Sequence, residues 1–118
     1  MMLNQIQPFI PAKDFQLSKQ FYQDLGFKLI YEDSQIILFE KDKVRLFIQR
    51  FYDTFFAENL VFQLYVDDIE QIHQLLSSLL TKYPMIKISK MKQAHYGMTF
   101  TLIEPSGVLF HITDPSRK

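Results

Sequence analysis

The sequence predicts an α+β fold built from two successive βαβββ modules, and three observations support this prediction. The predicted strands and helices follow one another in the order βαβββ twice. Each module's helix begins after an aspartate, and the pairs Asp14-Phe15 and Asp68-Ile69 lie 54 positions apart. The last strands also match, because residues 44–48 (VRLFI) align with residues 108–112 (VLFHI). A duplicated module explains all three observations.

The first module is expected at about residues 4–50. Its first strand contains Pro8 and Pro11, which have no N–H to donate, so we expect this strand at a sheet edge or interrupted. Asp14 can cap the following helix, and Gly26 suits the position that ends it. A hairpin turn is expected at residues 41–43. The predicted elements are a strand at 4–11, a helix at 15–24, and strands at 27–31, 36–40 and 44–49.

The second module is expected at about residues 58–114, after an unusually aromatic loop at residues 51–58. Asp67 and Glu70 are spaced like a capping box at the start of its helix. The helix carries an apolar stripe, and Tyr83-Pro84 ends it. The turn at residues 104–107 precedes the last strand. The predicted strands are 60–66, 86–91, 98–103 and 108–113.

Side chains in the strands alternate between an apolar face and a more polar one. Because neighbouring side chains point to opposite sides of a strand, Phe110 and Ile112 share one face, while His111 and Thr113 share the other. The segments at 44–49 and 60–66 alternate in the same way. Helices must cover the apolar face. The opposite face, rich in Gln, Arg, His, Thr and aromatic side chains, is the expected ligand-binding surface.

The composition excludes several functional classes. The 118 residues suffice for one domain, expected over residues 1–118, and the formal net charge is zero without a run of Lys or Arg, so we expect no nucleic-acid binding. The absence of cysteine excludes disulfides, thiol catalysis and Cys-ligated zinc. No signal peptide or membrane span is visible, so we expect a cytoplasmic protein without a membrane partner.

The arrangement resembles the vicinal oxygen chelate superfamily, which includes glyoxalases, extradiol dioxygenases and bleomycin-resistance proteins, and it is most similar to the last of these. The segments that carry the resemblance are Pro8-Phe9-Ile10, Phe21-Tyr22, Leu25-Gly26-Phe27, residues 41–48, Tyr96-Gly97, residues 104–107 and Phe110-His111-Ile112. The resemblance implies curved mixed sheets around a cup, with the helices on the outside. Fold alone does not determine function.

The metal-dependent members of the superfamily hold one divalent ion with His, Gln or Glu side chains on four strands. The corresponding positions resemble Gln7, Phe47, Val61 and His111. Phe and Val cannot coordinate a metal, and two ligands are fewer than such a site needs. We therefore expect no metal, no cofactor and no catalytic residue. His111 is read either as a hydrogen-bonding group in the cup or as a general acid or base.

Strand parity and the resemblance together give a candidate ligand-binding set. Tyr31 and Tyr96 resemble positions where bleomycin-resistance proteins place aromatic side chains against the drug. Because the set includes Arg45 and no carboxylate, we expect a flat, neutral or weakly anionic ligand, and weak binding of cationic bleomycin. The set is Phe9, Tyr31, Arg45, Phe47, Gln49, Gln63, Tyr65, Tyr96, Thr101 and His111.

The leading interpretation is a non-enzymatic protein that sequesters a small molecule. The alternatives are a metal-dependent glyoxalase-like lyase or dioxygenase, and a structural or sensory dimer with a vestigial cup. The resemblance also implies a homodimer in which the first strand is exchanged near Pro8. The aromatic side chains at residues 51–58 favour such an oligomer, or else seal the join between the modules.

Overall fold

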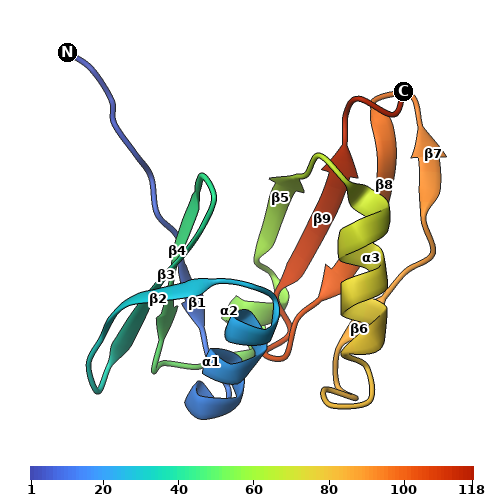
Figure 1. Ribbon diagram of the computed structural model, residues 1–118. Coiled ribbons are helices and arrows are strands. Elements are labelled where there is room, and N and C mark those ends of the chain that lie inside the picture. The colour runs from blue at the N-terminus through green and yellow to red at the C-terminus, as the bar shows by residue number, and fades with distance from the viewer. The chain divides into compact units, whose positions relative to one another are not determined.

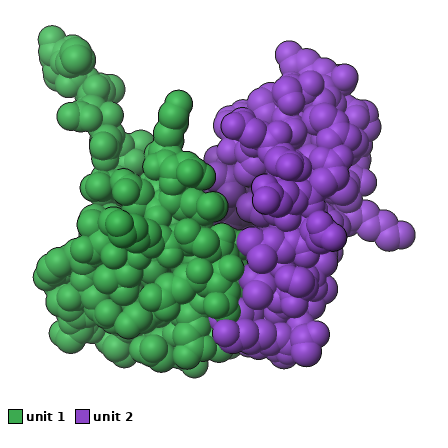
Figure 2. Space-filling view, in the orientation of Figure 1, with its two compact units in different colours: residues 1–53 green, residues 54–118 purple.

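A computed structural model describes all residues from 1 to 118. The chain divides into two compact units, residues 1–53 and residues 54–118, which Figure 2 colours green and purple. Each unit contains one mixed β-sheet with a ten-residue helix against it (Figure 1). The predicted α+β class with two βαβββ modules is therefore confirmed, and both sheets are open. Neither long helix has the length and apolar character needed to cross a membrane.

Unit 1 follows the predicted order with small changes at the element ends. Its four-stranded sheet has the order β1-β4-β3-β2, in which β1 is parallel to β4 and the other pairs are antiparallel. A bulge at Ile30 interrupts the pairing of β2 with β3. The elements are β1 (Phe9–Pro11), α1 (Phe15–Asp24), β2 (Lys28–Glu32), β3 (Ile36–Lys41) and β4 (Val44–Gln49).

The predicted first strand is too long, because only β1 forms. The Phe47 N–H donates to the carbonyl oxygen of Pro8 at 2.9 Å, and the ladder begins there. The residues before Pro8 pair with no strand of the chain, and Ile6 is almost fully exposed. The helix prediction is confirmed at both ends. Asp14 accepts a hydrogen bond from the Leu17 N–H at 3.0 Å, and Gly26 follows the helix with a φ of +103°.

Aromatic side chains fill the core between α1 and the sheet of unit 1. Phe21 packs edge-on against Tyr22, with ring centroids 5.3 Å apart, and Tyr22 lies over Phe39 at 6.0 Å. Ile37 and Ile48 complete this layer, and all five side chains are buried. The alternation predicted for residues 44–49 is confirmed here, since Ile48 lies in the core. The other face of the sheet is consequently left without a helix.

Unit 2 contains the second sheet, with the order β5-β9-β8-β6 and with β7 also paired to β8. Strand β5 is parallel to β9, as β1 is to β4. Helix α3 packs against β9 and buries Ile69 and Leu76, while Phe100 and Ile112 form the sheet side of the core. The elements are α2 (Thr54–Glu58), β5 (Val61–Tyr65), α3 (Ile69–Ser78), β6 (Lys87–Ile88), β7 (Lys92–Ala94), β8 (Gly97–Ile103) and β9 (Leu109–Asp114).

Three details of unit 2 differ from the prediction. The N-cap of α3 is Asp68, which accepts from the Gln71 N–H at 3.1 Å, so the proposed capping box at Asp67 is wrong. The aromatic loop contains the short helix α2, which buries Ala57. The strand expected at 86–91 is broken because the hydroxyl of Ser89 accepts from the Thr101 N–H at 2.8 Å, where a backbone carbonyl would continue the ladder.

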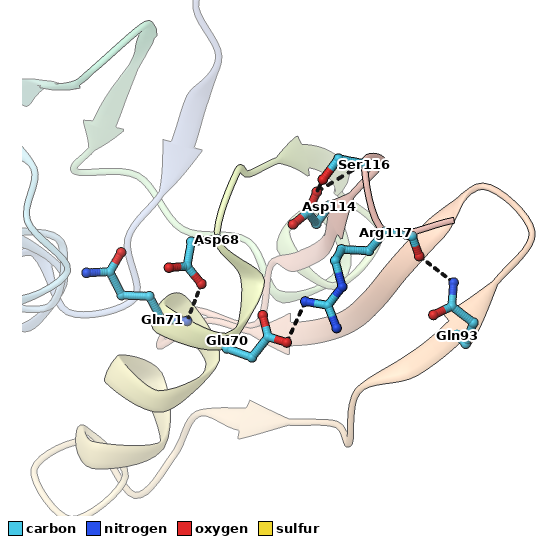
Figure 3. Close-up of polar contacts among 7 residues, drawn as sticks. All are labelled: Asp68, Glu70, Gln71, Gln93, Asp114, Ser116 and Arg117. Atoms are coloured by element: carbon cyan, nitrogen blue, oxygen red, sulfur yellow. Dashed lines mark hydrogen bonds and ion pairs between the residues drawn. The ribbon is translucent and has the colours of Figure 1, made fainter.

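The residues after β9 return to the start of α3 (Figure 3). The Arg117 guanidinium donates to Glu70, and the side-chain amide of Gln93 on β7 donates to the Arg117 carbonyl oxygen at 2.6 Å. The hydrogen bond from Arg117 holds the pKa of the Glu70 carboxyl below its usual range. Asp114 accepts from the backbone N–H and the hydroxyl of Ser116. These contacts hold the tail against β7 and α3.

Candidate functional site

An apolar and mostly aromatic row crosses the helix-free face of the unit 1 sheet, called here the unit-1 open face. The strand register aligns Phe9 with Phe47, Phe47 with Leu38, and Leu38 with Tyr31, so the row runs through all four strands. The Phe9 and Phe47 rings stack with centroids 4.3 Å apart and planes 8° from parallel. Phe9 is 45% exposed and Tyr31 is 50% exposed. The row therefore presents ring surface outside the core.

A hydrogen bond holds the ring of Tyr31 at one end of this row. Its hydroxyl donates to the Asp33 carboxylate at 2.8 Å, and this bond raises the pKa of the tyrosine. The backbone N–H groups of Gln35 and Ile36 also donate to Asp33, at 2.8 and 2.9 Å. The bond from Gln35 is the main cause of the lowered Asp33 pKa, followed by the bond from Tyr31. The Tyr31 hydroxyl is thus engaged within the protein.

Charged side chains form the next row of the unit-1 open face. The register aligns Lys28 with Glu40 and Glu40 with Arg45, and the Arg45 Nε lies 2.6 Å from Glu40 Oε1. Arg45 is therefore paired with a carboxylate that lies outside the predicted set, and Glu40 compensates its charge. Glu40 could have been found from the alternation of residues 36–40, which places it on the same face as Leu38. A cavity of about 510 Å³ beside this row is lined by residues 4–7, Glu40, Asp42, Lys43 and Arg45.

Gln49 lies on the same face in a third row. It aligns with Ile36 of β3 and Pro11 of β1, on the opposite side of the aromatic row from Arg45. Unit 1 therefore brings five of the predicted residues onto one face. They are Phe9, Tyr31, Arg45, Phe47 and Gln49.

The helix-free face of the unit 2 sheet, called the unit-2 open face, carries a polar row. The register aligns Gln63 with His111 and His111 with Thr101. The Gln63 amide donates to the Thr113 hydroxyl at 3.0 Å and to the His111 carbonyl oxygen at 3.2 Å. The parity prediction for these strands is confirmed, because Phe110 and Ile112 are buried on the other side.

Two threonines outside the predicted ligand-binding set fix the orientation of this row. The Thr99 hydroxyl donates to the Ile112 carbonyl oxygen at 3.0 Å and lies 3.0 Å from the Thr113 hydroxyl. Each hydroxyl has one proton, so Thr113 donates to Thr99 and accepts from Gln63. The hydrogen bonds therefore run from the Gln63 amide through the Thr113 and Thr99 hydroxyls to the Ile112 carbonyl oxygen of β9. Both threonines are buried, and the alternation along β8 and β9 was the available signal.

The two tyrosines of the predicted set that have not yet been placed, Tyr65 and Tyr96, lie in different parts of unit 2. Tyr65 is on the unit-2 open face, aligned with Thr113, and is 66% exposed. Tyr96 lies in the turn between β7 and β8, away from the ladder positions, where its ring meets that of His95 edge-on at 5.2 Å. Unit 2 thus brings four predicted residues onto one face, and Tyr96 lies outside that group. The four are Gln63, Tyr65, Thr101 and His111.

The side chains at the four positions that resemble metal ligands do not fit a divalent ion. In unit 1 the Gln7 amide donates to Gln5, and Phe47 stacks on Phe9. In unit 2 the register pairs Val61 with Leu109. The Val61 side chain has no atom that can coordinate a metal, so His111 is the only one of the two unit 2 positions that could do so. No three His, Asp or Glu side chains are placed so that they could hold a metal ion together.

No protein-family model matches this sequence, and no curated protein matches it. Solved structures do match. A bleomycin-binding protein in complex with bleomycin is 21% identical over 95% of this chain and 98% of that one, with a TM-score of 0.78. A bleomycin resistance determinant encoded on the transposon Tn5 is 22% identical over the same shares, also with a TM-score of 0.78. The chain has the vicinal oxygen chelate fold.

The vicinal oxygen chelate fold also includes a protein that was solved with a metal ion bound. A fosfomycin resistance protein from Listeria monocytogenes, solved with Mn(II) and sulfate, is 12% identical over 97% of this chain and 91% of that one, with a TM-score of 0.76. Drug-binding and metal-containing proteins thus share this fold. The predicted resemblance is confirmed at the level of the fold, and the function must be argued from the side chains.

Proposed function

We propose that this protein binds a flat aromatic small molecule without a metal ion and does not act as an enzyme. The observation that carries the proposal is the stacked pair Phe9 and Phe47 on the unit-1 open face. Exposed aromatic rings arranged in a row offer a stacking surface to a planar ligand, and each ring pair contributes about 0.5–1.5 kcal/mol beyond burial. The similarity to two bleomycin-binding and bleomycin-resistance structures supports a sequestering role.

The polar row supplies hydrogen-bonding groups of defined direction. Because the Gln63 amide protons point toward Thr113 and the His111 carbonyl oxygen, the Gln63 Oε1 atom remains as an acceptor for a ligand. No hydrogen bond orients the His111 imidazole, whereas an acid–base histidine normally has an orienting partner. We assign His111 and Thr101 to ligand binding rather than to catalysis. Tyr65 and Tyr96 offer further exposed rings.

The proposed ligand is neutral or weakly anionic. The unit-1 open face pairs its arginine with a carboxylate, and the unit-2 open face carries no carboxylate at its ladder positions. A cationic drug such as bleomycin would therefore find no concentration of negative charge on either face. Bleomycin is therefore a suitable probe of whether the protein binds cationic ligands.

A thermal-shift screen tests the proposal. The purified protein is heated with planar aromatic compounds, with bleomycin, and with Mn²⁺, Fe²⁺, Ni²⁺ or Zn²⁺. A ligand at a hundredfold excess over Kd stabilises the folded state by about 2.7 kcal/mol, which raises the melting temperature of a domain of this size by about 10 °C. We expect shifts with planar compounds and none with metals. Shifts with metals alone would instead favour a glyoxalase-like lyase or dioxygenase.

We further propose a homodimer in which the arm before β1 is exchanged between copies near Pro8. The arm supports this proposal because Met1, Met2, Leu3 and Ile6 are all largely exposed and pair with no strand of their own chain. Sedimentation at micromolar concentration is expected to give a dimer of about twice 14.1 kDa. A single monomeric species under these conditions would contradict the exchange.

A further inference from the structure

Two lysines lie at the outer edge of the unit-2 open face. Lys87 of β6 aligns with Ile103, and Lys92 of β7 aligns with Thr99. Ile103, Thr101 and Thr99 alternate along β8, so both lysines point to the face that carries His111. They flank the polar row on either side, because Thr101 lies midway between their two partners. Both are exposed.

Neither ammonium group has an ion-pair partner, in contrast to Arg45, which is paired with Glu40. The sequence from residue 71 to residue 103 contains no Asp or Glu. The two carboxylates that bound this stretch are occupied. Glu70 accepts from the Arg117 guanidinium, and Glu104 accepts from the backbone of Ser106 and Val108 at 2.8 and 3.1 Å. Positive charge on this face is therefore uncompensated.

The spacing of the lysines suits one anionic group placed over the polar row. Ile103 and Thr99 are four residues apart, or about 13 Å along the strand, which exceeds the size of one carboxylate or phosphate. Lysine is a point charge on a flexible four-carbon stem, so both side chains can reach inward from their ends toward Thr101. Ser89, between them in the chain, already accepts from the Thr101 N–H.

We propose that Lys87 and Lys92 bind a carboxylate, sulfonate or phosphate group of the ligand and so select for anionic aromatic compounds. This inference rests on the proposed function, because it concerns the polar row of the unit-2 open face that is proposed there to bind a ligand. Within unit 1 the charge of Arg45 is compensated by Glu40, whereas the lysines on the outer strands of unit 2 have no such partner. Attraction between partly exposed charges is weakened by salt, so the selectivity depends on ionic strength.

The test compares two probes of the same shape, 2-naphthoate and its uncharged methyl ester, by calorimetric titration at low salt. An exposed ion pair contributes up to about 1 kcal/mol, or about fivefold in affinity. The double variant Lys87→Gln/Lys92→Gln is expected to bind naphthoate about tenfold more weakly and the ester within twofold of the unaltered protein. Raising the salt concentration should weaken naphthoate binding to the unaltered protein and leave ester binding unchanged.

Lys82→Gln is the matched control, because Lys82 lies after α3 with its ammonium 5.5 Å from the Tyr83 ring centroid, outside the strands. This variant should bind both probes normally. Unchanged naphthoate affinity in the double variant, or an equal loss for both probes, would overturn the inference while ester binding still supports the proposed function. If neither probe binds the unaltered protein at millimolar concentration, both the inference and the proposed function fail.

Discussion

Replacing Gly97 by alanine is expected to lower the free energy of unfolding by about 3 kcal/mol. Gly97 begins β8 with a φ of +143°, a conformation that costs an L-residue about 1–2 kcal/mol. A Cβ atom built there would lie 2.4 Å from the Asp114 carbonyl oxygen and 2.9 Å from the Pro115 Cα atom. Both are backbone atoms, so the end of β9 and the tail would have to move, which adds about 1–3 kcal/mol.

Urea unfolding measures this effect, and Gly26→Ala provides the matched control. Gly26 also has a positive φ, but a Cβ atom there would meet only the end of the Lys41 side chain, at 3.3 Å. That flexible side chain can move, so the control should cost about 1 kcal/mol, from backbone strain alone. The transition midpoints should shift without a change in slope. Equal losses for the two variants would show that the contact with Asp114 is unimportant.

Replacing Phe47 by alanine is expected to weaken binding of the naphthyl probes at least tenfold. Phe47 lies in the middle of the aromatic row and stacks on Phe9, so its loss removes a stacking surface and releases the Phe9 ring. Aromatic stacking contributes about 0.5–1.5 kcal/mol, and lost burial against the ligand adds about 1 kcal/mol or more. The affinity for both naphthoate and its ester should fall, unlike the selective loss expected for the lysine variants.

Two further variants make this measurement specific. Phe47→Leu keeps an apolar side chain without a ring and should give an intermediate affinity. Phe55→Ala removes the ring of a phenylalanine on α2 that is 79% exposed and lies off both sheets, and it should bind the probes normally. Binding unaffected by Phe47→Ala would contradict the role given to the aromatic row.

The elements that the sequence predicts well are those whose pattern is local. Residues 15–24 form a helix because an aspartate caps it and an apolar stripe faces the core, and residues 44–49 form a strand because their alternation matches one buried face. The prediction failed where a distant group decides the structure. The bond between Ser89 and Thr101 breaks the strand expected at 86–91, and its partners are twelve residues apart.

The candidate site was predictable to a similar extent. Strand parity together with the family resemblance placed nine of the ten residues on helix-free faces. Tyr31 came from the resemblance alone, because the bulge at Ile30 breaks the alternation of β2. Parity did not reveal that Glu40 neutralises Arg45, since that contact requires the register between β3 and β4. The hydrogen bond between Thr99 and Thr113 likewise depends on the register between β8 and β9. The position of Lys87 and Lys92 beside the polar row follows only from the pairing of β6 and β7 with β8.

The pairing of first and last strands has a consequence for synthesis on the ribosome. In each unit the first strand pairs only with the last one, β1 with β4 and β5 with β9. The first strand must therefore wait for the last to emerge, which happens at Gln49 for unit 1 and at Asp114 for unit 2. Such non-local pairs close slowly. Because β4 is made well before β9, unit 1 can still complete its sheet while much of unit 2 is being synthesised.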